Sequence, residues 1–208
     1  WGKGSIAFRL EKDGECVLEE KKSLTEAGNE DADAEPFYIQ KTNSSKTVQN
    51  SFAWRINNPE LWSAEDPQLY DLSLAVYNEA GELQEVIPQK VGFRRFEMKD
   101  GIMTLNGKRI VFKGVNRHEF SSVSGRHVSE EELRKDLRTM KQNNINAIRT
   151  CHYPDASLIY QLCDEYGIYM IDETNLESHG SWDVAEMTKD FTYTVPHNKP
   201  EWLEMMLD

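Results

Sequence analysis

Polar side chains follow three short apolar segments in the second half of the chain. These polar groups are Asn116 to Glu119, Arg149 to Pro154, and the set Glu173, Asn175, Glu177 and His179. Each group holds side chains that can bind a sugar hydroxyl, transfer a proton or ligate a metal ion. Groups that follow successive parallel strands meet at the carboxyl edge of the sheet, where α/β proteins bind ligands. Their joint occurrence predicts one shared site, although a single group could equally be loop solvation or a helix cap.

Glu177 and His179 are separated only by Ser178. Alternate residues of an extended segment point the same way, so both side chains can reach one ion. A carboxylate oxygen suits Mg²⁺ or Mn²⁺, and one imidazole is tolerated beside it. Two ligands do not close such a site, so water or other residues must supply the rest. A surface glutamate beside a hydrogen-bonded histidine is the alternative interpretation of this pair.

His118, His152 and Arg149 complete the candidate set. In a sugar site, imidazoles would hydrogen-bond hydroxyls, and more strongly as the transition state forms. Arg149 at a strand end could orient a carboxylate through a bidentate contact. The alternatives are core histidines and an ordinary ion pair. Trp182 would stack on a sugar face or pack within its loop.

Other reactive side chains receive no role. Cys151 and His152 are neighbours in sequence, and neighbours on a strand point to opposite faces, which argues against a Cys–His nucleophile. His127 and His197 lie in polar loop surroundings.

The second half is predicted to fold as β-α-β-α-β. Buried strands are expected at 110–115, 147–148 and 168–171, with helices over 129–142 and 158–166. Ser129 and Glu132 have the spacing of a capping box, and Gly167 is expected to end the second helix. Residues 200–207 have the pattern of the start of a further helix.

The first half has a period of two instead. Short strands are expected at 6–10, 16–18, 37–39, 52–56, 72–76 and 83–91, with a solvated loop at 21–35 and a proline-containing crossover at 58–70. Strands at this spacing without helices predict an antiparallel β-sandwich. A hairpin around Asn106-Gly107 follows. The sequence therefore predicts two domains, a sandwich over 1–96 and an α/β domain over 97–208.

Composition limits the classes of function. The net charge of -12, from 24 basic and 36 acidic residues, argues against nucleic-acid or membrane-surface binding. No apolar run approaches the ~20 residues of a membrane helix. The 3 cysteines form no metal or disulfide pattern, which favours a reducing, cytoplasmic setting. Because the first residue is Trp1, we expect the chain to begin inside a longer protein.

Several motifs resemble glycoside hydrolase family 2, and within it the branch of microbial β-galactosidases. They are Asn58 to Ser63, Val91 to Arg94, Leu105 to Lys108, Gly114 to Glu119, Met140 to Asn144, Arg149 to Pro154 and Asp172 to Gly180. The resemblance implies an immunoglobulin-like sandwich followed by the first three β/α units of an incomplete (β/α)₈ TIM barrel. A whole barrel takes roughly 250 residues. We therefore expect a fragment whose inner sheet face is apolar and uncovered.

The resemblance also implies roles for the candidate residues. Glu177 and His179 would ligate an active-site Mg²⁺, a pair that the similar glucuronidase branch lacks. His118 and His152 would contact the galactosyl group and stabilise the transition state. Arg149 would lie beside the nucleophilic glutamate.

The two catalytic glutamates of the family have no counterpart here. Asn29-Glu30 lies outside the barrel and Asn78-Glu79 is a sandwich turn, so both catalytic carboxylates are expected beyond Asp208. The resemblance implies a retaining hydrolase of terminal β-galactosides such as lactose, a homo-oligomeric parent protein, and a fragment that is itself inactive and self-associates through its open barrel face. The alternatives are another family 2 glycosidase, a β-glucuronidase or β-mannosidase, and a non-catalytic sandwich module that binds carbohydrate or protein.

Overall fold

The computed structural model describes residues 3–24, 52–177, 179–190 and 203. The chain divides into two compact units, Trp1–Val111 and Phe112–Asp208. The sequence places the boundary after Phe96, whereas the small sheet that begins at this residue belongs to the first unit.

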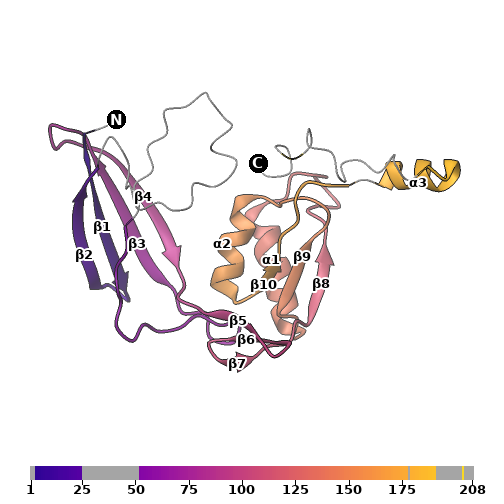
Figure 1. Cartoon of the computed structure of the whole chain (residues 1–208), viewed down its shortest axis with the longest axis horizontal. Helices are drawn as coiled ribbons and strands as arrows, with labels where there is room; N and C mark the ends of the chain where they lie inside the picture. The colour runs from indigo at the N-terminus through magenta and orange to yellow at the C-terminus, as the bar shows by residue number, and fades with distance from the viewer. Residues whose placement is uncertain (1–2, 25–51, 178, 191–202, 204–208) are drawn as a thin grey trace. The chain divides into compact units, whose positions relative to one another are not determined.

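The main sheet of the first unit has four antiparallel strands in the order β2-β1-β3-β4 (Figure 1). Its strands are β1 (Ser5–Lys12), β2 (Glu15–Ser23), β3 (Tyr70–Tyr77) and β4 (Leu83–Val91). Pro88 lies on the edge strand β4, where its missing N–H breaks no bond inside the sheet. The antiparallel prediction is confirmed, and β2 runs into the segment that was expected to be a loop. A second sheet packed on this one is not seen among the described residues of the unit.

Aromatic side chains cover β1. Phe8 is buried, and its ring centroid lies 5.1 Å from that of Phe52 and 4.4 Å from that of Trp54. The predicted strand at 52–56 is wrong, because these residues pair with no strand in the described part of the chain. Their alternating burial is as predicted. The period of two therefore reflects side-chain packing on β1 and not ladder hydrogen bonds.

A second, three-stranded sheet in this unit has the order β5-β6-β7. It consists of β5 (Phe96–Lys99), β6 (Ile102–Leu105) and β7 (Lys108–Arg109). The predicted hairpin is confirmed, whereas β5 was missed. The sheet is tied to Trp62, which is 1% exposed, because Asn106 Nδ2 donates to the Trp62 carbonyl oxygen at 3.1 Å.

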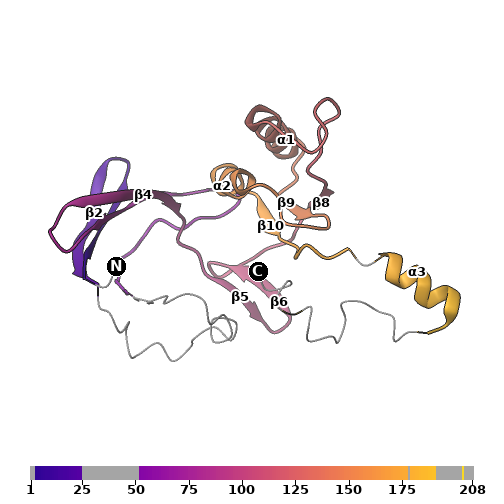
Figure 2. The same cartoon turned by 90° about the horizontal axis from the view of Figure 1, so that it is seen from above.

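The second unit contains a parallel sheet in the order β10-β9-β8. Its elements are β8 (Gly114–Arg117), α1 (Glu130–Gln142), β9 (Ala147–Thr150), α2 (Ser157–Tyr166), β10 (Tyr169–Ile171) and α3 (His179–Thr188). Both α1 and α2 lie on one face of this sheet, as the two views agree (Figures 1 and 2). The predicted β-α-β-α-β order is confirmed.

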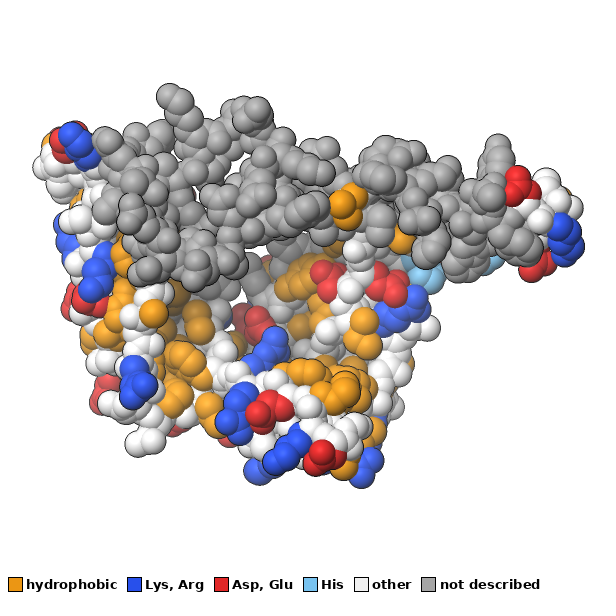
Figure 3. Space-filling model, in the orientation of Figure 1, with side chains coloured by type: hydrophobic (Ala, Val, Ile, Leu, Met, Phe, Trp, Pro, Cys, Tyr) orange, Lys and Arg blue, Asp and Glu red, His pale blue; other side chains and the backbone are white. Residues whose placement is uncertain are grey.

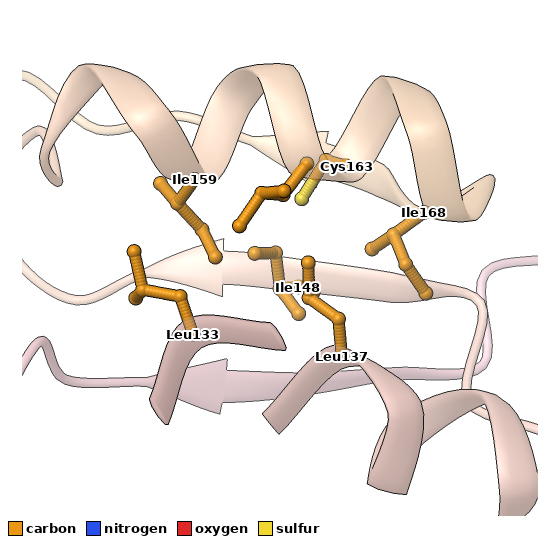
Figure 4. Packing of buried hydrophobic residues seen from close by; sticks show 7 residues of the cluster. Leu133, Leu137, Ile148, Ile159, Cys163 and Ile168 are labelled. Carbon is orange, nitrogen blue, oxygen red and sulfur yellow. The ribbon is translucent and has the colours of Figure 1, made fainter. Parts of the chain in front are cut away.

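Both helix ends are as predicted. Ser129 caps α1 and exchanges hydrogen bonds with Glu132 in a complete capping box. Gly167 ends α2 in the left-handed conformation, with φ of 68°. The side chains that α1 and α2 direct at the sheet form one core with Ile148 of β9 (Figure 4). Its buried members are Leu133, Leu137, Ile148, Ile159, Leu162, Cys163 and Ile168.

Two strand predictions in this unit need correction. The strand expected at 110–115 begins at Gly114, and Val115 is 36% exposed because β8 is an edge of the sheet. The segment 168–171 is buried only at its start, since Ile171 is 50% exposed at the other edge.

The face of the sheet away from the helices is not the uncovered apolar surface that was expected. Cross-strand partners on this face are Gly114, Ala147 and Tyr169, then Asn116, Arg149 and Ile171. Ala147 and Tyr169 are buried, and the Phe112 ring lies against Tyr169 at 5.4 Å between centroids. This face therefore combines small residues, the buried Tyr169 and polar side chains, and Ile171 is its exposed apolar residue.

Some predictions concern residues outside those described: the strand at 37–39, the loop at 25–35, the role of His197 and, apart from Leu203, the helix at 200–207. The side chain of Trp182 is also not described. In the part of the chain that can be followed, no helix is long and apolar enough to cross a membrane.

Candidate active site

Arg149 lies at the centre of the polar end of the parallel sheet. The register of the three strands aligns it with Asn116 of β8 and Ile171 of β10. Its Nη1 donates to Asn116 Oδ1 at 3.3 Å, and its Nε donates to Glu173 Oε1 at 2.5 Å. The hydrogen bond that Arg149 donates to Glu173 is the main reason why the pKa of Arg149 is raised. The structure thus brings all three predicted polar groups to one guanidinium.

His152 lies between two carboxylates. Its Nδ1 is 3.4 Å from Glu173 Oε2, and its Nε2 is 3.6 Å from Glu177 Oε2. Glu173 therefore bridges Arg149 and His152, a contact that the sequence did not assign to it. Its position is set by Thr150, whose side-chain oxygen accepts from the Glu173 backbone N–H at 2.9 Å. Thr150 is fully buried, so this support is rigid.

Glu177 and His179 are adjacent, as their spacing predicts. Glu177 Oε1 lies 3.5 Å from His179 Nδ1 and accepts from the His179 backbone N–H at 3.0 Å, at the start of α3. Carboxylate oxygen and imidazole nitrogen are acceptable ligands for a divalent cation. The described residues include no group of three or more histidine, cysteine, aspartate or glutamate side chains arranged around one ion. The Glu177 carboxylate and the His179 imidazole fit a divalent cation as two of its ligands. Water molecules would have to supply most of the remaining ligands.

His118 joins this arrangement through His152. The two imidazole rings are 5.6 Å apart between centroids and meet edge to face. On its other side, His118 Nδ1 lies 3.4 Å from the hydroxyl oxygen of Tyr153, which also accepts from the Arg126 guanidinium. Both predicted histidines are therefore within one cluster.

An open pocket of about 460 Å³ occupies this end of the sheet. Residues from the second and third polar groups line it: Arg149, His152, Glu173, Thr174, Leu176, Glu177 and His179. Histidine side chains reach the surface here beside acidic and basic ones (Figure 3). With donors and acceptors on several sides, this pocket can bind a neutral polyhydroxyl ligand and orient a carboxylate against Arg149.

Arg117 does not face the pocket, although it stands within the first polar group. The register of β8 directs it to the helix side, where it is 6% exposed and pairs with Asp155 and Asp136. Burial raises the pKa of Asp155, Arg117 opposes this shift, and Glu119 adds to it. On the same side, burial and a hydrogen bond to Asp172 raise the pKa of Tyr160 to about 12.

The sequence pattern of "Glycosyl hydrolases family 2, TIM barrel domain" matches residues 96–208, and that of "Glycosyl hydrolases family 2" matches residues 4–94. The chain belongs to glycosyl hydrolase family 2. This family membership agrees with the resemblance that the strand-end motifs carry.

Curated family 2 relatives are named β-galactosidases. The chain is 54% identical over 168 residues to the one from Halalkalibacterium halodurans, with 81% of this chain and 16% of the relative covered. It is 56% identical over 151 residues to the one from Clostridium acetobutylicum, with 73% and 17% covered. The chain therefore spans about one sixth of the length of these relatives.

Solved family 2 structures that resemble the chain include β-glucuronidases. The enzyme from Parabacteroides merdae superposes with a TM-score of 0.63 at 27% identity, covering 82% of this chain and 19% of that one. The enzyme from Bifidobacterium dentium, solved with coumarin-3-O-glucuronide, gives 0.67 at 25% identity, covering 82% and 24%. Both likenesses extend over the two units of the chain.

Proposed function

We propose that this chain is part of a retaining β-galactosidase that hydrolyses terminal β-D-galactosides such as lactose. The observation that carries the proposal is the single pocket in which Arg149, His152, Glu177 and His179 meet at the carboxyl end of a parallel sheet. High identity to curated β-galactosidases supports the galactoside as substrate. The three parallel strands would be the opening units of a (β/α)₈ barrel, and the first unit would contribute to an immunoglobulin-like sandwich.

The histidines would hold the sugar. His152 is 39% exposed at the pocket wall and is oriented by Glu173 and Glu177, so its ring has a fixed direction. His118 contacts it edge to face and would reach a neighbouring hydroxyl. Hydrogen bonds of this kind accelerate the reaction only if they strengthen in the transition state. The pair would therefore act mainly on the distorted sugar ring.

Arg149 would orient the nucleophilic carboxylate. Its Nε is already bound to Glu173, and its Nη1 contacts Asn116 at 3.3 Å, so the guanidinium plane is held from two sides. A guanidinium fixed in this way favours an ionised carboxylate next to it. Retaining hydrolysis needs a nucleophile and an acid/base that lie about 5–5.5 Å apart. The family resemblance places both outside this chain, so we expect the 208-residue chain alone to leave galactosides intact.

Glu177 and His179 would hold a magnesium ion. The ion would supply a positive charge beside the acid/base, while the protein contributes one carboxylate and one imidazole. Because two protein ligands give weak retention, Mg²⁺ should bind this chain with low affinity. Calorimetry on the chain and on Glu177→Gln tests this, and tight binding lost in the variant would contradict it.

A family 2 β-glucuronidase is the second candidate, because the similar solved structures from Parabacteroides merdae and Bifidobacterium dentium are β-glucuronidases. The two candidates differ in what the pocket must bind. A glucuronide carries a carboxylate on the sugar and would need a free cationic partner in the pocket. The chain is 54% and 56% identical to the two curated β-galactosidases but only 27% and 25% identical to these two β-glucuronidases, which favours the uncharged galactoside.

The decisive experiment uses the whole protein that contains this sequence. Its kcat/KM is measured with nitrophenyl β-galactoside, β-glucuronide and β-mannoside. We expect the galactoside to be preferred, and His152→Ala to lower kcat/KM by roughly a hundredfold. His127→Ala is the matched control, since this exposed histidine lies outside the pocket. Preference for another glycoside, or equal effects of the two variants, would contradict the proposal.

The cytoplasmic location, the homo-oligomeric parent and self-association of this chain remain predictions. Sedimentation of the 208-residue chain at several concentrations tests the last of them. A concentration-independent monomer would contradict it.

A further inference from the structure

A buried ion pair joins two residues that lie close in sequence to the two histidines. Arg117 Nη1 donates to Asp155 Oδ2 at 2.7 Å, and the two side chains are 5% and 0% exposed. Arg117 immediately precedes His118 in the chain, and Asp155 follows His152 by three residues. The ion pair therefore joins the two segments that carry the histidines.

Two further bonds join the same segments. The backbone N–H of Cys151 donates to the Arg117 carbonyl at 3.0 Å, and the backbone N–H of Ala156 donates to Glu119 Oε2, also at 3.0 Å. His118 is thus flanked on both sides by cross-links to the segment of His152. The ion pair is the fully buried member of this set and the one made by two charged groups, so it is the strongest constraint.

We propose that Arg117 and Asp155 are positioning residues that set the distance and angle between the His118 and His152 rings. This inference rests on the proposed function, in which the two rings hydrogen-bond to the same sugar. His118 is exposed and His152 is 39% exposed, so packing alone does not hold either ring. Glu173, Glu177 and Tyr153 contact the rings at 3.4–3.6 Å, and the 5.6 Å edge-to-face arrangement also requires the two backbones to be held at a fixed separation.

Burying the charges of this ion pair costs free energy, and this supports a role in geometry and not in stability. Burial raises the pKa of Asp155 despite Arg117, and Asp155 Oδ1 accepts no hydrogen bond from the described residues. A buried ion pair with an unsatisfied oxygen is often no more stabilising than apolar residues of the same size. Compared with apolar residues, the charged pair adds a fixed relative orientation of the two side chains, because the planar guanidinium binds a carboxylate in few geometries.

The same guanidinium provides a matched control. Arg117 also contacts Asp136 of α1 at 3.2 Å, and that carboxylate is 47% exposed. Asp136→Asn removes the negative charge from a contact of the same chemical kind with the same arginine. It leaves the connection between the histidine segments intact.

The kinetic test compares Asp155→Asn with Asp136→Asn in the whole protein, well below the melting temperature of each. Misplacement of the rings should lower kcat/KM for a nitrophenyl β-galactoside by roughly ten- to a hundredfold in Asp155→Asn. Asp136→Asn should stay within about threefold of the wild type. In a His118→Ala background the effect of Asp155→Asn should shrink, because the positioned ring is gone. Equal losses in the two variants, or fully additive effects with His118→Ala, would overturn the proposal.

A structural readout separates this inference from the proposed function. In the 208-residue chain labelled at histidine, the nuclear Overhauser effect between the His118 and His152 ring protons should be present in wild type and Asp136→Asn. It should be lost in Asp155→Asn. Should Asp155→Asn fail to fold, Arg117→Lys replaces it, since lysine keeps the charge but loses the planar fork. An unchanged signal in either folded variant refutes the positioning role, whereas a protein inactive on galactosides refutes only the proposed function.

Discussion

Leu137→Ala should destabilise the second unit strongly and selectively. Leu137 is fully buried, and it packs in the core formed by α1, β9 and α2. Its neighbours come from both helices and from the strand between them (Figure 4). Because these elements support one another, they cannot close around the space that a smaller side chain leaves.

The expected loss lies in the upper part of the range for buried leucines. Leucine-to-alanine changes cost about 2–5 kcal/mol, more where the site cannot collapse, so we expect about 3–5 kcal/mol here. Single domains are stable by about 5–15 kcal/mol, so the variant should be close to unfolding. Because the chain has two units, hydrogen exchange of peptides from α1 and α2 is the suitable assay, and it reports the stability of this unit alone.

Leu83→Ala is the matched control. Leu83 lies on β4 of the first unit and is 54% exposed, so its truncation should change stability by no more than about 0.5 kcal/mol. If Leu137→Ala lowered the protection of α1 and α2 by as little as the control does, the core would be loosely packed. The helices would then not be what holds the strand ends in register, and the explanation of the site geometry would fail.

Two further predictions follow from shifted pKa values. Hydrogen bonds from the Ser121 side chain and from Ser129 lower the pKa of Glu132 to about 2, from an ordinary value of 4.5. The stability that Glu132 contributes is therefore complete above pH 4.5 and is lost as the pH falls toward 2, so Glu132→Gln should flatten the acid dependence of exchange in α1 over this window. Burial raises the pKa of Cys163 to about 12, so iodoacetamide at pH 8 should modify the exposed Cys16 and leave Cys163 intact until the protein unfolds, as mass spectrometry of the peptides would show.

Local signals in the sequence are sufficient where the structure is determined locally. The capping box at Ser129, the glycine at the end of α2 and the Asn106-Gly107 turn depend on neighbouring residues, and all were predicted. The period of two at 52–56 correctly predicts which side chains are half-buried and which are exposed. It does not predict a strand, because a strand also needs a pairing partner from elsewhere in the chain.

The candidate site was predictable in its members but not in its connections. Polar residues after three parallel strands identify Arg149, His152 and Glu177 without a structure. Which of them face the pocket depends on the register of the sheet, and a shift of one residue reverses every side chain. This is why Arg117, in the middle of the first polar group, lies on the helix side, and why the bridging role of Glu173 was not foreseen.

At the carboxyl end of the parallel sheet, the two faces therefore differ in role, one joining the strand ends and the other facing the pocket. On the helix side, buried groups such as Arg117, Asp155 and Thr150 make short bonds that join one strand end to the next. On the other side, Arg149 and His152 are partly exposed and both contact Glu173, Arg149 at 2.5 Å and His152 at 3.4 Å. Because side chains alternate between the two faces along each strand, a buried, hydrogen-bonded residue lies next to a side chain that faces the pocket. For this reason, side chains at and just beyond the strand ends can hold a fixed geometry, because residues close to them in sequence are fixed by buried bonds.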